Sequence, residues 1–183
     1  KDLLNVKGVR STQGSPIYAD LIPDASDLTV TNLEDAGGVI YAKSNTPEFG
    51  AGANTFNEVF GPTLNPWDTS KSCAGSSGGS AVALATGTAW LASGSDLGGS
   101  LRNPASFCGI VGFRPSPGRV AKGPGALPFA NMSTEGPMGR TVRDVALMLD
   151  AMSGQYPVDP ISLAKPAISF VNATDSLPAP KKV

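Results

Sequence analysis

Histidine is absent from the 183 residues of this chain. A Ser-His-Asp relay therefore cannot operate within it, and a serine nucleophile would need another base, for which lysine is the usual substitute. Charged residues are also scarce, because they make up 16% of the sequence against roughly 25% in an average soluble domain. This scarcity indicates a turn-rich enzyme core; the alternative is a surface that further polypeptide covers.

Cysteine occurs only as Cys73 and Cys108. Two thiols far apart in the sequence suit a reducing compartment, so we expect free structural cysteines and a cytoplasmic protein. No apolar run approaches the roughly 18 residues of a membrane span. The formal net charge is -1 and basic residues gather only in the Lys181-Lys182 pair, so we expect no nucleic-acid binding. Because the chain opens at Lys1 without Met, we expect its native start to lie upstream.

Glycine and proline are abundant, with 22 and 16 residues, and predict many turns and close backbone approaches. Apolar spacing predicts helices over 28–36 and 142–152, the second capped by Thr141. Small residues predict a third helix over 78–86. Short apolar runs predict strands at 39–43, 89–93, 109–113 and 167–171. Helices and strands in this order predict an α/β fold.

The composition changes near residue 154. Residues 1–154 carry the predicted helices and most of the predicted strands, so we expect them to form the core of the fold. Residues 155–183 are rich in proline and predict a connection to further polypeptide.

Two glycine-rich segments each present a serine: Gly-Ser-Ser-Gly-Gly-Ser at 75–80 and Asp-Leu-Gly-Gly-Ser-Leu-Arg at 96–102. A serine among glycines can be approached closely by a substrate and surrounded by free backbone N–H groups, as acyl transfer requires. The first segment lies at the start of the helix predicted over 78–86, where unpaired N–H groups are available.

Other interpretations of the first segment are weaker. It matches the G-x-S-x-G nucleophile elbow, but that motif uses a histidine base. It could bind phosphate at a helix N-terminus, yet the Walker order of Gly-Lys-Ser/Thr is missing. A flexible Gly-Ser turn is the plainest alternative. The Ser162-x-x-Lys165 pattern lies in the proline-rich tail without companion motifs, so we attribute it to chance.

Several segments together resemble the amidase signature family, and the resemblance covers most of residues 1–150. The segments that carry it are Lys1-Asp2, Glu-Phe-Gly at 48–50, 61–68, the first glycine-rich segment, 95–105, and 107–115. The family implies an α/β/α fold with a large mixed sheet flanked by helices, of which this chain would be the catalytic N-terminal part.

The resemblance implies a Ser-cis-Ser-Lys triad, with Ser100 as nucleophile, Ser76 as bridging serine and Lys1 as base. A neutral amine could accept the Ser76 proton while Ser76 accepts that of Ser100, so Lys1 must be kept partly neutral by burial. Ser77 is an alternative bridging serine. The alternative bases are Lys7, Lys43 and Lys71.

We expect further roles for residues in and near the two loops. Asp96 and Arg102 are expected to hold the nucleophile loop, with Ser77 bonding within the first loop. Cys73 is expected to pack as a small apolar residue beneath that loop. Backbone N–H groups are expected to form the oxyanion hole at Leu97, Gly98, Gly99 and Ser100. Residues expected near the acyl pocket are Phe49, Gly50 and Ala51.

The sequence therefore predicts an amidohydrolase that cleaves a carboxylic amide through an acyl-enzyme on Ser100. We expect a small-molecule amide as substrate, no metal and no other cofactor, with a homodimer left open and the rest of the polypeptide needed to complete the fold. One alternative is the glutaminase subunit of a tRNA-dependent amidotransferase, and another is a phosphate- or nucleotide-binding module.

Overall fold

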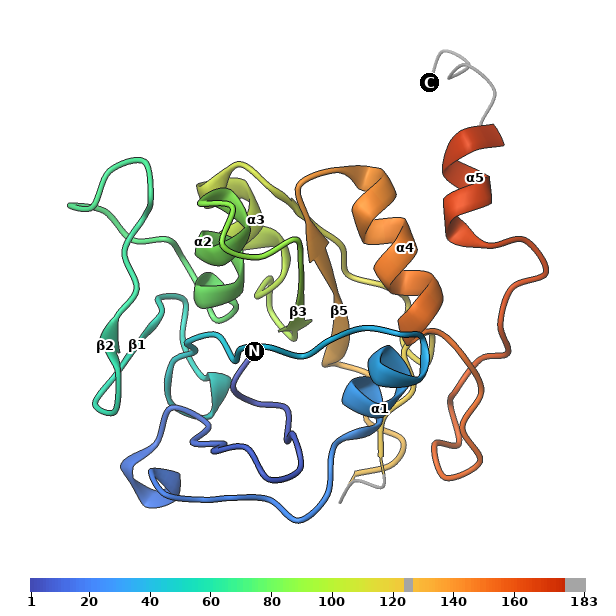
Figure 1. The fold of residues 1–183 in the computed structure, drawn as a ribbon, viewed down its shortest axis with the longest axis horizontal. Coiled ribbons are helices and arrows are strands. Elements are labelled where there is room, and N and C mark those ends of the chain that lie inside the picture. Colours follow the sequence, from blue (N-terminus) through green and yellow to red (C-terminus); the bar gives the residue numbers. More distant parts are fainter. Residues whose placement is uncertain (124–126, 177–183) are drawn as a thin grey trace.

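The computed structural model describes residues 1–123 and 127–176. A three-stranded antiparallel sheet lies at its centre, formed by β3 (Leu91–Asp96), β5 (Thr134–Gly139) and β4 (Val111–Gly112) in the order β3-β5-β4. Helices α2 (Gly78–Ala85) and α3 (Arg102–Cys108) lie on one side of the sheet, and α4 (Val142–Met152) lies on the other (Figure 1). The α/β fold class predicted from the sequence is confirmed.

The remaining elements surround this centre. Helix α1 (Leu28–Asp35) contacts α4, and the chain before it holds a short 3₁₀ turn, η1 (Pro16–Tyr18). A second 3₁₀ turn, η2 (Glu48–Gly50), precedes a hairpin of β1 (Phe56–Asn57) and β2 (Gly61–Pro62). Helix α5 (Phe170–Ser176) packs on α4. None of the helices in the described residues is both long and apolar enough to cross a membrane.

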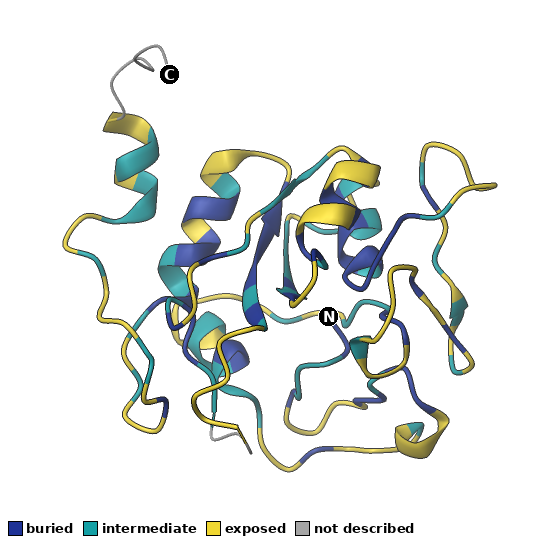
Figure 2. Cartoon of the chain, turned by 180° about the vertical axis from the view of Figure 1, so that it is seen from behind, coloured by how far each residue is buried: buried dark blue, intermediate teal, exposed yellow. Residues whose placement is uncertain are grey.

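Each face of the sheet has its own apolar core. The core beneath α2 and α3 consists of Cys73, Ala81, Leu84, Leu101, Ala105, Cys108 and Met138. The core beneath α4 consists of Val120, Met148, Leu149 and Met152, with Leu33, Leu91 and Phe170 packed against it. Figure 2 shows buried and exposed residues alternating along α4, as expected for a helix with one face on a sheet.

Three of the predicted helices are confirmed as α1, α2 and α4. Helix α4 begins with a capping box, in which the Thr141 side chain accepts the Asp144 N–H and the Asp144 carboxylate accepts the Thr141 N–H. The strands predicted at 89–93 and 109–113 correspond to β3 and β4 with shifted ends.

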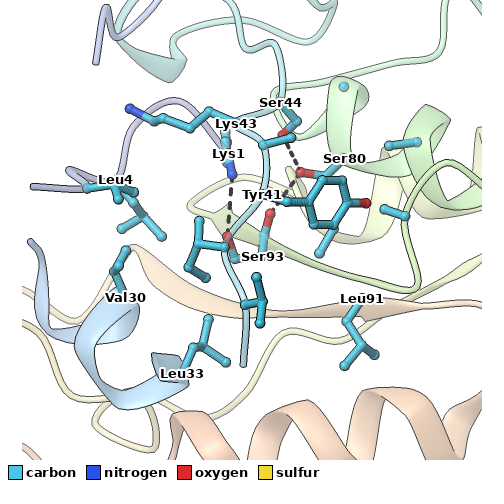
Figure 3. A pocket seen from close by; sticks show the side chains of 18 of the residues that line it. Lys1, Leu4, Val30, Leu33, Tyr41, Lys43, Ser44, Ser80, Leu91 and Ser93 are labelled. Atoms are coloured by element: carbon cyan, nitrogen blue, oxygen red, sulfur yellow. Dashed lines mark hydrogen bonds between the residues drawn. The ribbon is translucent and has the colours of Figure 1, made fainter. Parts of the chain in front are cut away.

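The strand predicted at 39–43 is wrong. These residues have no regular secondary structure and no ladder partner in the described part of the chain, and Val39 and Tyr41 are 83% and 61% exposed. They instead line a cavity of about 310 Å³ between α1, α2 and β3, with Leu33 and Leu91 on its far walls (Figure 3). The sequence of the segment favours a strand, but a strand does not form because no neighbouring strand pairs with it.

The strand predicted at 167–171 is also wrong, because α5 covers part of it. Ser169 accepts the N–H of Asn172 through its hydroxyl, and the Asp150 carboxylate on α4 accepts the N–H groups of Phe170 and Val171. These contacts satisfy the free donors of the first helical turn. The last residues of the predicted connection, 177–183, and with them the Lys181-Lys182 pair, lie outside the described residues.

Candidate active site

Lys1 lies against the first glycine-rich loop, with 8% of its surface exposed. Its Nζ donates hydrogen bonds to Ser76 Oγ at 2.7 Å and to Ser95 Oγ at 2.9 Å. Burial lowers the pKa of Lys1 to about 7, although the negative charges of Asp96 and Glu135 act to raise it. Near neutral pH the amine is therefore available in both its neutral and its charged form, as an acid–base group requires.

Asp2 anchors the backbone on which Lys1 sits. Its N–H donates to the carbonyl of Ser44 at 2.9 Å. Its carboxylate accepts hydrogen bonds from the Thr12 hydroxyl at 2.6 Å and the Thr12 N–H at 3.1 Å, and it pairs with the ammonium of Lys43. Since these groups fix the residue next to Lys1, the Lys1 side chain enters the interior in a defined direction.

The other lysines considered as bases are either exposed or paired with a carboxylate. Lys43 pairs with Asp2, Lys7 is exposed, and Lys71 is exposed and pairs with Asp68 at 3.3 Å. Within the described residues, Lys1 is the lysine of these four whose amine bonds a serine of a glycine-rich loop.

Ser76 and Ser77 occupy different positions in the first loop, which contains a cis peptide bond between Gly75 and Ser76. Ser76 is 2% exposed and faces Lys1. The Ser77 hydroxyl instead donates to the Ser95 carbonyl and accepts the Ser95 N–H, both at 3.3 Å. Ser77 thus joins the loop to β3, and Ser76 is the serine that the structure brings to Lys1.

Glycine is required where this loop enters α2. A Cβ atom on Gly78 would lie 2.2 Å from Thr55 Oγ1, and one on Gly79 would lie 2.4 Å from the backbone nitrogen of Asn45. The Thr55 hydroxyl donates to the Ala74 carbonyl at 2.9 Å and accepts the Gly78 N–H at 3.1 Å. The loop is therefore held from both ends by a neighbouring segment that approaches it closely.

Ser100 lies in the second loop, immediately before α3, and is half-buried. The Ser77 N–H donates to the Ser100 carbonyl at 3.3 Å, so the two glycine-rich loops are neighbours. Among residues 1–123 and 127–176, the Ser100 hydroxyl makes no hydrogen bond. Catalytic hydrogen bonds often tighten only when substrate binds, so this geometry is compatible with a nucleophile.

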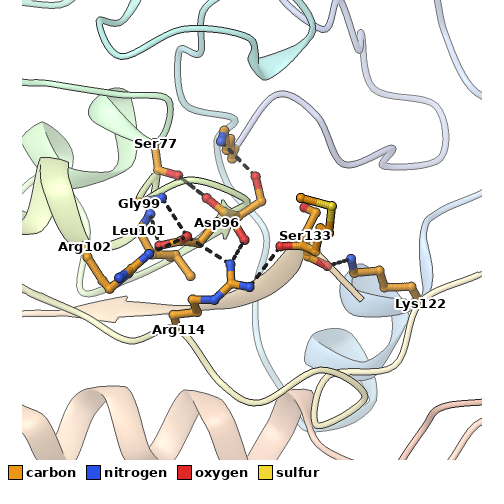
Figure 4. A network of polar contacts seen from close by, with 11 residues as sticks. Ser77, Asp96, Gly99, Leu101, Arg102, Arg114, Lys122 and Ser133 are labelled. Atoms are coloured by element: carbon orange, nitrogen blue, oxygen red, sulfur yellow. Dashed lines mark hydrogen bonds and ion pairs between the residues drawn. The ribbon is translucent and has the colours of Figure 1, made fainter. Parts of the chain in front are cut away.

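Asp96, which is fully buried at the end of β3, organises the second loop (Figure 4). Its carboxylate accepts hydrogen bonds from Arg102 Nε at 3.0 Å, Arg114 Nη1 at 3.0 Å, and the N–H groups of Gly99 and Leu101 at 2.8 and 3.2 Å. Burial alone would raise the pKa of Asp96, but the hydrogen bonds and the Arg102 charge outweigh it and hold the pKa well below its usual range. These contacts support the scaffold role predicted for Asp96 and Arg102.

Two members of this site were missed by the sequence analysis. Ser95 receives a hydrogen bond from Lys1, and Arg114 bonds both Asp96 and the Met132 carbonyl. Arg114 lies in the 107–115 segment that carries the family resemblance, which was the available signal. Ser95 lies in the 95–105 segment that also carries the resemblance, but its contact with Lys1 depends on a residue that is distant in sequence.

The Gly99 N–H, one of the four predicted oxyanion donors, already donates to Asp96. Leu97, Gly98 and Ser100 remain the candidates for that role. Gly99 is needed for shape, since its φ is +121° and a Cβ atom would lie 2.7 Å from the Asn103 side chain.

Phe49, Gly50 and Ala51 lie at η2. The Phe49 N–H donates to the Gln13 carbonyl at 2.8 Å, and its ring, 48% exposed, meets Tyr18 edge-on at 6.1 Å. Gly50 faces Leu3, and Ala51 lines a surface cavity of about 420 Å³. The part that these residues would play in an acyl pocket stays a prediction.

Both cysteines are free and fully buried in the core beneath α2 and α3, as predicted. Burial raises the pKa of Cys73, and it raises the pKa of Cys108 to about 11 with a contribution from Cys73. Both groups are therefore protonated thiols at neutral pH, which argues against a cysteine nucleophile.

We expect Asp96→Asn to lower the free energy of unfolding by about 3 kcal/mol, because the change leaves the charges of Arg102 and Arg114 without their buried partner. The depressed pKa of Asp96 means that the wild-type protein holds this stability above about pH 4 and loses it as the pH falls further. Urea unfolding at pH 7 and pH 3 measures both effects. Asp68→Asn, at an exposed carboxylate, is the control, and equal losses in both variants would contradict the prediction.

Comparison with known proteins supports the interpretation. A protein-family model described as Amidase matches residues 1–183. One subunit of the glutamyl-tRNA(Gln) amidotransferase of Deinococcus radiodurans is 43% identical over 178 residues, which cover 97% of this chain and 37% of that relative. The chain thus spans about 37% of the length of this curated relative.

Solved structures give the same result for the fold. The chain matches 6-aminohexanoate cyclic dimer hydrolase complexed with substrate, with a TM-score of 0.91 and 34% identity, over 97% of this chain and 38% of that chain. It also matches the peptide amidase of Stenotrophomonas maltophilia, with a TM-score of 0.81 and 32% identity, over 96% of this chain and 37% of that chain.

Proposed function

Because the chain belongs to the Amidase family, we propose that the protein hydrolyses a carboxylic amide to an acid and ammonia or an amine, through an acyl-enzyme on Ser100. The observation that carries the proposal is the 2.7 Å hydrogen bond between the Lys1 amine and the Ser76 hydroxyl, in a chain without histidine. A buried lysine with a pKa near 7 supplies the base that a serine nucleophile needs.

In the first step Ser100 Oγ attacks the amide carbonyl, its proton passes to Ser76, and the Ser76 proton passes to the neutral Lys1 amine. The N–H groups of Leu97, Gly98 and Ser100 are our candidates to stabilise the oxyanion. The Lys1 ammonium then returns the proton through Ser76 to the leaving nitrogen as the C–N bond breaks. Water repeats the sequence on the ester, releases the acid and restores Ser100.

The substrate we propose is a small amide; the two structural relatives are named as a 6-aminohexanoate cyclic dimer hydrolase and a peptide amidase. The free, buried thiols agree with a cytoplasmic setting. The name of the curated relative favours a second candidate, the glutaminase subunit of an amidotransferase. Hydrolysis of simple amides by the protein alone supports the first candidate, and glutaminase activity that requires added partner subunits supports the second.

Labelling with a fluorophosphonate probe tests the proposed chemistry. The intact protein is incubated with the probe, and the modified peptide is identified by mass spectrometry. We expect one adduct, on Ser100, and faster labelling as the pH rises through about 7, because the neutral form of Lys1 is the base. An adduct confined to another residue, or no adduct while amides are hydrolysed, would contradict the assignment.

A further inference from the structure

Lys1 lines a second cavity, of about 180 Å³, in addition to the cavity of about 310 Å³. Polar residues from several parts of the chain line this second cavity. They come from the start of the chain, from strands β3 and β5, and from the segments that precede α1 and β5. The polar side chains that line it are Lys1, Asp27, Ser95, Lys122, Ser133 and Glu135. The mechanism above uses only Lys1 among these residues, so a polar space adjoining the base has no assigned role.

Glu135 is placed to act on Lys1 through this cavity. It lies on β5 directly opposite Ser95 of β3 in the antiparallel ladder, and Ser95 accepts a hydrogen bond from the Lys1 amine. The Thr29 hydroxyl, on α1, donates to the Glu135 carboxylate. Two elements far apart in the sequence thus fix a carboxylate in a cavity that Lys1 also lines.

We propose that Glu135 is a positioning residue that keeps the Lys1 amine basic enough to take up the serine proton, and so sets the pH at which catalysis begins. The inference rests on the proposed function. Burial alone would make the amine too weak a base, and a carboxylate across the cavity stabilises its charged form. Lys1 can then hold the proton until the leaving nitrogen takes it.

Other charged groups near Lys1 and Glu135 also affect the pKa values of these two residues. Asp96, on β3, raises the pKa of Lys1 more than Glu135 does, but its carboxylate also pairs with two arginines and holds the second loop. Burial raises the pKa of Glu135, while the Thr29 hydrogen bond and the charge of Lys122 favour the carboxylate.

Three further charged groups lie near this pair, one of which is the α-amino group of Lys1, whose charge favours the Glu135 carboxylate. Asp27, before α1, acts with burial to raise the pKa of Glu135. Lys43 points away from Lys1 and pairs with Asp2 (Figure 3). The Glu135 carboxylate has no arginine partner in the described residues, so its removal should change the pKa of Lys1 without breaking the ion pairs that the removal of Asp96 would break.

The test is the pH dependence of kcat/KM and of fluorophosphonate labelling in Glu135→Gln. We expect the midpoint of the acid limb to fall by roughly half a pH unit or more, because the loss of an opposite charge makes Lys1 easier to deprotonate. The plateau rate should also fall, since the amine is a weaker base.

Thr29→Val, which removes the hydrogen bond to the carboxylate, should also lower the midpoint, but by less than Glu135→Gln does. Glu34→Gln, at an exposed carboxylate on α1, is the matched control and should leave the midpoint unchanged.

A second measurement separates this inference from the proposed function. The ¹³Cε signal of Lys1 in the intact protein, titrated by NMR, reports the protonation of the amine without catalysis. A lower midpoint in Glu135→Gln supports the inference even if Ser100 proves not to be the nucleophile. An unchanged or raised midpoint in both Glu135→Gln and Thr29→Val overturns it, while Ser100 labelling in the wild-type protein would leave the proposed function intact.

Discussion

Replacing Ser100 by alanine is expected to reduce amide hydrolysis by about 10⁵-fold or more, because the acyl-enzyme cannot form without the hydroxyl that attacks the carbonyl. The fold should be unaffected, since the Ser100 hydroxyl makes no hydrogen bond within the described residues and its contact with Ser77 uses the backbone carbonyl. The measurement is kcat/KM on an aryl amide that releases a coloured amine, with urea unfolding of the same variant.

Two alanine variants in the other loop give the comparison. Ser76→Ala removes the hydroxyl that we propose passes the proton from Ser100 to Lys1, so we expect a large loss that does not exceed that of Ser100→Ala. Ser77→Ala loses only the contacts to the Ser95 backbone and should retain more activity than either. If Ser100→Ala kept substantial activity while Ser76→Ala had none, the nucleophile would have to be reassigned to Ser76.

Much of the site could be predicted from the sequence because its motifs are local. The two glycine-rich loops stand out by composition and the missing histidine favours a lysine base, but only the family resemblance distinguishes Lys1 from Lys7, Lys43 and Lys71. Ser95 and Glu135 do not stand out, because their relation to Lys1 arises only from the pairing of β3 with β5. Residue type alone cannot show which side chains of two paired strands lie opposite each other and next to Lys1.

The fold was predictable where local signals and packing agree. Helix α4 has both a cap and an apolar face, and its predicted bounds are those observed. Strand β5 was missed because Gly136 and Pro137 lie in its middle, which normally argues against a strand. It forms because β3 and β4 pair with it on both sides. Helix α3 was missed because of Pro104, which lies in the first turn, where proline is tolerated.

Lys1→Met is expected to have opposite effects on activity and stability. Losing the base should lower kcat/KM by about 10³-fold, within the range found for general acid–base groups. The wild-type rate should rise with pH through about 7, because only the neutral amine accepts the Ser76 proton, and this limb should be absent from the variant. The pH–rate profiles of the wild-type protein and of Lys1→Met measure the loss in kcat/KM and the loss of the pH-dependent limb.

The stability of Lys1→Met follows from the same pKa. The folded-state value of about 7 lies below the unfolded value, so the unfolded chain holds more protons between these values and the buried amine disfavours folding there. At pH 8 this cost is about 3 kcal/mol. Leaving the hydroxyls of Ser76 and Ser95 without a donor costs about 1 kcal/mol each, so the net expected gain is about 1 kcal/mol.

Lys71→Met is the matched control, because that amine is exposed and should affect neither rate nor stability. Urea unfolding from pH 6 to pH 10 gives the sign of the Lys1 effect: the advantage of Lys1→Met should shrink as the pH rises, since the cost of the buried amine disappears above its unfolded pKa. A variant that is inactive yet less stable than the wild type at pH 8 would mean that Lys1 serves mainly to hold the two loops. A gain in stability with a loss of activity would mean instead that the protein gives up stability to keep the Lys1 amine buried as a base.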